Sequence, residues 1–179
     1  VEASAMNDQR QADAQRQEFV SSTCQGRTAA EIKDLADTCM GKKMPEAAID
    51  FYAAALRHPE AAPTTPGGKE LRSRILSNKS AAYMRLKPPL VANARKALVN
   101  ADECQSLRPD WSKGHFRRAA ALERLERPSE AAAAYEAAIS CEGADSAAST
   151  EIVAKLDDLR HRMDASVAST LYFEHLEIL

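Results

Sequence analysis

The chain has 179 residues, the length of one ordinary domain, and 45% of them are hydrophobic, which is enough to bury a core. With 28% charged residues and a formal net charge of −2, composition excludes a general attraction to nucleic acid or anionic membranes. No apolar run approaches the roughly 18 residues that cross a bilayer, and the N-terminal segment lacks the apolar centre of a secretory signal. We therefore predict a cytoplasmic, globular protein with no nucleic-acid partner and no membrane partner.

Residues 1–27 are polar and only weakly periodic. This composition is typical of a flexible leader or of a loosely docked extra helix, and the sequence leaves both alternatives open. The chain starts at Val1 rather than at a methionine, so we expect it to be a fragment of a longer protein.

Residues 28–143 carry a repeated spacing of four and then three residues. It occurs at Ala48, Tyr52 and Ala55, at Ala97, Ala101 and Cys104, and at Ala131, Tyr135 and Ala138. The second and third sets lie 34 residues apart. This is the period of the helix-turn-helix tetratricopeptide unit, whose small residues let two antiparallel helices approach closely. The first set lies 49 residues before the second, and the Pro/Gly-rich stretches 58–68 and 87–90 can absorb the extra 15 residues.

The repeats predict an all-α fold of three helix pairs. First (A) helices are expected near 28–41, 69–86 and 111–126, and second (B) helices near 45–57, 91–107 and 128–141. Pro45 and Pro128 stand where a first helical turn tolerates a missing amide hydrogen. Cys39 and Cys104 fall at core positions and suit buried, reduced thiols.

Residues 144–179 predict one long amphipathic helix. Its apolar residues recur every three or four positions, at Ile152, Leu156, Leu159, Met163, Val167 and Leu171. Such a helix would cap the repeat stack. The apolar last residues, 171–179, either continue this cap or support self-association of the chain.

Two motifs about one repeat apart, SNKSAAY at 77–83 and PDWSKGHFRRAAAL at 109–122, resemble the second and third repeats of carboxylate-clamp tetratricopeptide domains of heat-shock co-chaperones. The resemblance covers roughly residues 30–143 and implies a right-handed superhelix whose A helices line a concave groove. It also implies a partner, the C-terminal EEVD-like peptide of heat-shock protein 70 or heat-shock protein 90 type chaperones. Carried over by position, the peptide-binding residues are Lys33, Asp37, Asn78, Lys113 and Arg117.

The chemistry of these residue types fits that ligand. A peptide that ends in aspartate presents two carboxylates, so it needs cations to offset desolvation and amide donors to fix its direction. Lys113 and Arg117 are four residues apart, and therefore share one helical face. Arg74 holds the place in the second repeat that Lys113 holds in the third, and adds positive charge. Any one of these lysines, taken alone, is more typical of a solvated helix surface, and it is the set at matching repeat positions that favours the clamp.

Asp37 departs from the family, which has asparagine there. Lys33 and Asp37 are four residues apart on one helix, so the carboxylate can pair with the lysine expected to hold the ligand. Two unit charges 4 Å apart near a protein surface interact by about 4 kcal/mol before salt and rearrangement reduce it. Asp37 is therefore expected either to weaken the binding of an anionic tail or to redirect the groove to another ligand.

Other chemistry is not indicated. The histidines and cysteines lack metal-ligand spacing, and the chain has no GxxxxGK[ST], GxGxxG or GxSxG motif. We predict a non-enzymatic interaction module without metal or cofactor. Two alternatives stay open: a repeat scaffold that binds another partner, and a targeting domain of a longer enzyme.

Overall fold

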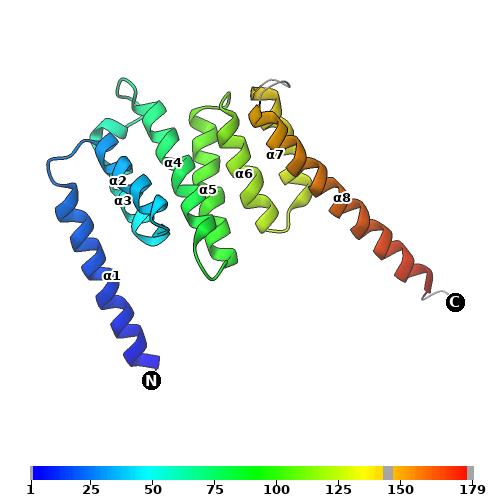
Figure 1. Ribbon diagram of the computed structural model, residues 1–179, viewed down its shortest axis with the longest axis horizontal. Helices are drawn as coiled ribbons and strands as arrows, with labels where there is room; N and C mark the ends of the chain where they lie inside the picture. Colours follow the sequence, from blue (N-terminus) through cyan, green and yellow to red (C-terminus); the bar gives the residue numbers. More distant parts are fainter. Residues whose placement is uncertain (1, 143–146, 177–179) are drawn as a thin grey trace.

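The computed structural model describes residues 2–142 and 147–176, with the side chains of 6–8, 10–142 and 149–165. All regular elements in this part of the chain are helical. They are α1 (Glu2–Cys24), α2 (Ala29–Gly41), α3 (Pro45–Arg57), the 3₁₀ turn η1 (Pro59–Ala61), α4 (Gly68–Arg85), α5 (Val91–Leu107), α6 (Ser112–Arg124), α7 (Pro128–Glu142) and α8 (Ala147–Leu176). The prediction of an all-α repeat fold is confirmed, because α2–α3, α4–α5 and α6–α7 pack as three successive helix pairs (Figure 1).

Local sequence explains where several of these helices start. Thr28 and Glu31 form a reciprocal capping box at the start of α2, where each side chain accepts from the other residue's backbone N–H. Pro45 occupies the first turn of α3, where its missing N–H costs nothing. Gly67 precedes α4 with φ of 71°, a left-handed conformation that favours glycine. These signals set the helix boundaries within a few residues of the predicted ones.

The repeated small residues lie in the core. Ala48, Ala97 and Ala131 are fully buried. The aromatic members of the pattern, Tyr52 and Tyr135, are each 1% exposed. The predicted repeat spacing therefore marks the core. The core comprises one cluster of residues from α1 to α4 and a second cluster from α6 to α8.

The 58–68 insertion connects the first and second helix pairs. The Glu60 carboxylate accepts a hydrogen bond from the Ala29 backbone N–H at 3.0 Å, so this insertion also caps α2. Gly68 lies directly against the insertion: a Cβ at this position would be 2.0 Å from the Ala62 carbonyl oxygen. The close approach fixes the position at which α4 begins.

The helices α1 and α8 lie at opposite ends of the stack (Figure 1). On α1, Val20 is buried, Arg16 pairs with Asp50 of α3 at 2.5 Å, and the Phe19 ring meets the Phe51 ring edge-on at 6.4 Å. The second half of α1 therefore packs against α3.

The helix α8 covers the other end of the core. Ile152, Leu156 and Leu159 are buried against α6 and α7. The predicted self-association concerns side chains of 171–179, which lie outside those that the structure describes. Among the described helices, none is long and apolar enough to span a membrane.

Candidate peptide-binding site

A hydrogen-bonded chain of polar side chains crosses α2, α4 and α6. Lys33 Nζ lies 2.9 Å from Asp37 Oδ2, Asn78 Nδ2 lies 3.0 Å from Asp37 Oδ1, and Lys113 Nζ lies 3.4 Å from Asn78 Oδ1. Four of the predicted site residues, one to two per A helix, are thus brought together on one surface. We call the surface that carries these four residues and Arg117 the A-helix face.

Asp37 lies at the centre of this chain. Its Oδ1 also accepts a hydrogen bond from the Tyr52 hydroxyl of α3. Partial burial alone would raise the pKa of Asp37, but hydrogen bonds from Lys33 and Tyr52 and the charge of Lys33 outweigh it and hold that pKa below its ordinary value. Asp37 is therefore an ionised carboxylate at neutral pH.

Lys33 is held between two carboxylates. Its Nζ lies 2.8 Å from Asp34 Oδ1 and 2.9 Å from Asp37 Oδ2, and its side chain is only 16% exposed. Burial lowers the pKa of Lys33, but the two aspartates outweigh burial and raise the pKa above its ordinary value. The protein itself neutralises this cation.

Lys113 and Arg117 of α6 contrast with Lys33. Within the described residues, no acidic side chain lies at ion-pair distance from either cation, and the buried Nε of Arg117 has no hydrogen-bond partner. Burial, and then repulsion by Arg85, lower the pKa of Arg117; burial, and then repulsion by Arg117, lower that of Lys113. The guanidinium group of Arg117 lies 5.6 Å from the centre of the Phe116 ring. Within the described residues, these two cations therefore differ from Lys33, which two aspartates neutralise.

Arg74 lies apart from the hydrogen-bonded chain. It is exposed on α4, and no hydrogen bond or ion pair links it to another described residue. Its predicted contribution to the site stays a prediction.

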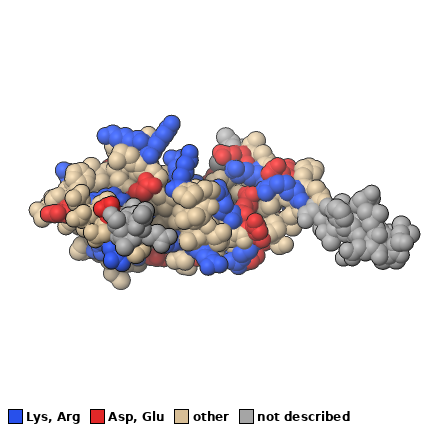
Figure 2. All heavy atoms as spheres, turned by 90° about the horizontal axis from the view of Figure 1, so that it is seen from below, with Lys and Arg blue, Asp and Glu red and all other residues tan. Residues whose placement is uncertain are grey.

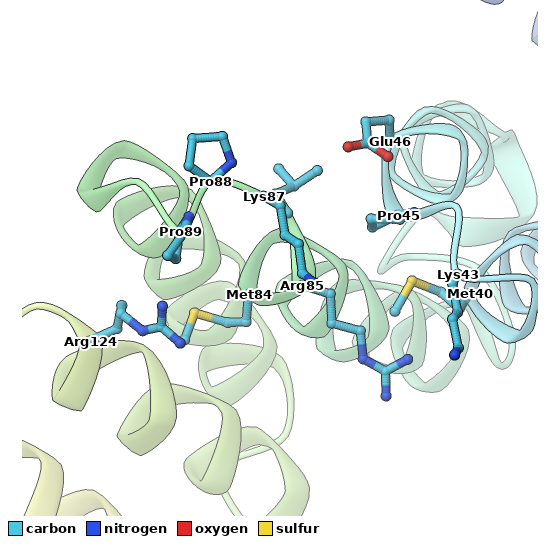
Figure 3. A pocket seen from close by; sticks show the side chains of 11 residues that line it. Met40, Lys43, Pro45, Glu46, Met84, Arg85, Lys87, Pro88, Pro89 and Arg124 are labelled. Atoms are coloured by element: carbon cyan, nitrogen blue, oxygen red, sulfur yellow. The ribbon is translucent and has the colours of Figure 1, made fainter.

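A pocket that sequence reasoning missed adjoins the A-helix face. It measures about 950 Å³ and lies where α2, α4 and α6 end. Figure 3 shows its main side chains: Met40, Met84, Lys43, Arg85, Lys87 and Arg124. The sequence contained a signal for this pocket. Arg85 lies seven residues, or about two helical turns, after Asn78, and Arg124 lies seven residues after Arg117.

The surroundings of this pocket are mainly basic. Glu46 is its one acidic lining residue in the part of the chain that the structure describes. In the view from below, lysine and arginine side chains project along the molecule with acidic side chains among them (Figure 2). The lining of this pocket thus carries more basic than acidic side chains, whereas Lys33 on α2 is neutralised by Asp34 and Asp37.

The described residues contain no group of His, Cys, Asp and Glu arranged to hold a metal ion. Cys39 is half-buried, and Cys104 is fully buried, with its thiol 3.4 Å from the Ser73 carbonyl oxygen. Burial raises the pKa of Cys104 to about 11, so this thiol stays protonated.

Comparison with known proteins finds similarity to a heat-shock protein and to a tetratricopeptide repeat protein. No family model matches the chain. Over 109 residues it is 35% identical to a heat-shock protein Sti1 homologue of Schizosaccharomyces pombe, which covers 60% of the chain but 16% of that protein. Over 86 residues it is 35% identical to human tetratricopeptide repeat protein 28, covering 48% of the chain and 3% of that protein. The chain thus spans a small part of these relatives.

Solved structures show the same fold. The Sgt2 tetratricopeptide domain of Aspergillus fumigatus is 25% identical and covers 78% of this chain and 82% of its own, with a TM-score of 0.62. The first tetratricopeptide domain of RPAP3 (Spaghetti), bound to the HSP90 peptide SRMEEVD, is 19% identical and covers 76% of this chain and 94% of its own, with a TM-score of 0.61. The fold is that of tetratricopeptide repeat domains.

Proposed function

We propose that the A-helix face binds the C-terminal, carboxylate-ended peptide of HSP70 or HSP90 type chaperones in the cytosol, and that the protein is a co-chaperone or adaptor. The observation that carries this proposal is the pair Lys113 and Arg117, two cations on one face of α6 with no carboxylate partner among the described residues. The domain of RPAP3 that shares this fold binds an HSP90 peptide ending in EEVD.

The energetics of Arg117 favour an anionic ligand. A buried ionised group with an unmade hydrogen bond costs free energy in the unliganded protein, on the order of 1–3 kcal/mol. A carboxylate offsets that cost, because its oxygens accept the charge-assisted hydrogen bonds that the guanidinium group can donate. Lys113 adds a second charge to the same anion.

The basic pocket extends this site along the peptide. Met40 and Met84 offer an apolar, adaptable lining, and Lys43, Arg85, Lys87 and Arg124 surround it with positive charge. An acidic peptide that binds Lys113 and Arg117 and runs toward the ends of α4 and α6 would place further acidic and apolar residues there. This second contact supports an acidic tail rather than a single anion.

A titration with three peptides tests the proposal. An EEVD-ended peptide, its C-terminally amidated twin and an unrelated acidic peptide are titrated into the protein by calorimetry. We expect the free carboxylate to bind at least tenfold more tightly than the amide, since one good charge-assisted contact is worth about 1.4 kcal/mol or more. Equal affinities for all three peptides would show that the A-helix face does not read a terminal carboxylate.

Matched variants locate the contact. Lys113→Met and Arg117→Met each remove a cation from the site, and each is expected to weaken binding of the free carboxylate about tenfold or more. Arg95→Met removes one cation from α5, where Arg95 is exposed, and serves as the control for net charge. A loss of affinity in Arg95→Met equal to that in Arg117→Met would mean that only overall charge matters.

The short match to the relatives supports a second proposal. Because the chain corresponds to only 16% of the Sti1 homologue and 3% of tetratricopeptide repeat protein 28, its repeats would act as a non-enzymatic targeting module within a longer protein. This proposal is compatible with the first one, because both need the A-helix face to bind a peptide.

A further inference from the structure

The pocket of about 950 Å³ at the ends of α2, α4 and α6 has both apolar and charged lining residues. Met40 and Met84, in the last turns of α2 and α4, are partly buried, and their flexible thioether side chains adapt to apolar ligands of different shape. The charged lining residues are four cations and one carboxylate: Lys43, Arg85, Lys87, Arg124 and Glu46. A ligand in this pocket therefore meets an apolar lining and an excess of positive charge.

The four cations are exposed and are not neutralised by the protein. Within the part of the chain that the structure describes, no ion pair and no side-chain hydrogen bond involves any of them. In the view of Figure 3, Arg85 and Lys87 lie between Met84 and Arg124 on one side and Met40 on the other. Cations gathered around one apolar lining attract a partner of opposite charge.

The backbone at Lys43 has a conformation that favours glycine. Its φ is 59°, and the Met44 N–H donates to the Cys39 carbonyl oxygen at 2.9 Å, which closes the turn after α2 as in a Schellman motif. Glu126, with φ of 56°, holds the equivalent position in the turn after α6. A lysine in this conformation destabilises the turn relative to glycine, whereas its side chain supplies one of the pocket's cations.

The chemistry of the pocket favours a peptide among anionic ligands. Its volume is near the upper end of the roughly 300–1,000 Å³ typical of ligand pockets, far more than one carboxylate or phosphate fills. Its described lining residues include no aromatic ring on which a nucleic-acid base could stack. Pro45, Pro88 and Pro89 lack a backbone N–H, so they cannot donate to a peptide backbone as an added strand requires. A ligand is therefore held mainly through its side chains.

We propose that this pocket is a second binding site, which takes an internal acidic segment that carries an apolar side chain. The apolar side chain packs on Met40 and Met84, and carboxylates on both sides of it pair with the surrounding cations. Both contacts are needed, because exposed ion pairs are individually weak. The proposal goes beyond the proposed function, since it requires neither a free C-terminus nor Lys113 and Arg117.

Three capped peptides test this proposal on the natural protein. EELEE, EESEE and QQLQQ, each N-acetylated and C-terminally amidated, are titrated and followed by NMR of the backbone amides. We expect EELEE to shift amides in residues 40–46 and 84–90 and to bind at least tenfold more tightly than the others, because EESEE lacks the apolar side chain and QQLQQ lacks the charges. Equal affinities, or shifts confined to residues 112–118, would overturn the proposal.

Two double variants separate the pocket from overall charge. Lys43→Gly with Arg124→Gln removes two lining cations and should weaken EELEE binding about tenfold. Lys42→Gln with Arg95→Gln removes the same charge from exposed positions outside the lining and should leave the affinity within about twofold. An equal loss in both would mean that only net charge attracts the peptide.

The two equivalent turns provide a second comparison. Lys43→Gly and Glu126→Gly should both raise the melting temperature, because glycine adopts the left-handed conformation without strain. Only Lys43→Gly should weaken EELEE binding, by about threefold, and an unchanged affinity in this more stable variant would exclude Lys43 from the site and count against the proposal. Preference for a free over an amidated EEVD peptide is measured separately, so either proposal can fail alone.

Discussion

At the scale of single residues, the site combines a cation that the protein neutralises, Lys33, with two cations of α6 that have no carboxylate at ion-pair distance among the described residues. Lys33 has Asp34 and Asp37 as partners, whereas Arg117 is largely buried with an unbonded Nε. A buried group of this kind is destabilising in the free protein and persists at sites where a ligand completes its contacts. Arg117 is therefore where stability and binding should oppose each other.

Replacing Arg117 should separate these two effects. Arg117→Met keeps a long unbranched side chain but removes the buried charge, so we expect the free energy of unfolding to rise by about 1 kcal/mol. Denaturant unfolding measures this change. Lys113→Met is the control, because Lys113 is less buried than Arg117 and its replacement should alter stability by less than about 0.5 kcal/mol. A clear loss of stability in Arg117→Met would mean that the guanidinium group supports the fold.

At the scale of helices, the sequence predicted most of the fold. Helices α3 and α5 have the predicted bounds, and α2, α4, α6 and α7 differ by one or two residues at their ends, because proline, glycine and capping residues mark where the backbone must turn. The site was less predictable. The sequence placed Lys33 next to Asp37 by helical spacing, but the bonds from Tyr52 and Asn78 join different helices and depend on packing. The basic pocket likewise forms only where three helix ends meet.

Two glycines test the close approach between an inserted loop and a helix. A Cβ at Gly68 would lie 2.0 Å from the Ala62 carbonyl oxygen and 2.9 Å from that of Glu60, so α4 or the backbone of the insertion must move. We expect Gly68→Ala to lower the free energy of unfolding by about 2–3 kcal/mol. Gly41→Ala has open space at the same test position and should be neutral or slightly stabilising. Thermal unfolding of the two variants measures the difference, and equal melting temperatures would contradict the close approach.

At the scale of the whole molecule, two core clusters are joined by the helices that carry the site. The first cluster draws on α1 to α4 and the second on α6 to α8, and the chain from Asp37 through Asn78 to Lys113 crosses from one to the other. In stacked repeats each unit contacts mainly its neighbours, so one end can open while the other stays folded. A peptide held by both α4 and α6 would couple the two ends.

A substitution that creates a cavity beneath α8 should reveal this coupling. Leu156 is 4% exposed in the second cluster, so Leu156→Ala should cost about 2–4 kcal/mol, whereas Val153→Ala, at a position 39% exposed on the same helix, should cost less than about 0.5 kcal/mol. Hydrogen exchange should then speed up in α6 and α7 more than in α2 and α3.

A carboxylate-ended peptide at 100 times its Kd should add about 2.7 kcal/mol of stability and slow exchange again in α6. Equal acceleration of exchange in all helices of Leu156→Ala would instead show one cooperative unit. Peptide protection confined to α2 and α4 would show that Lys113 and Arg117 do not hold the ligand.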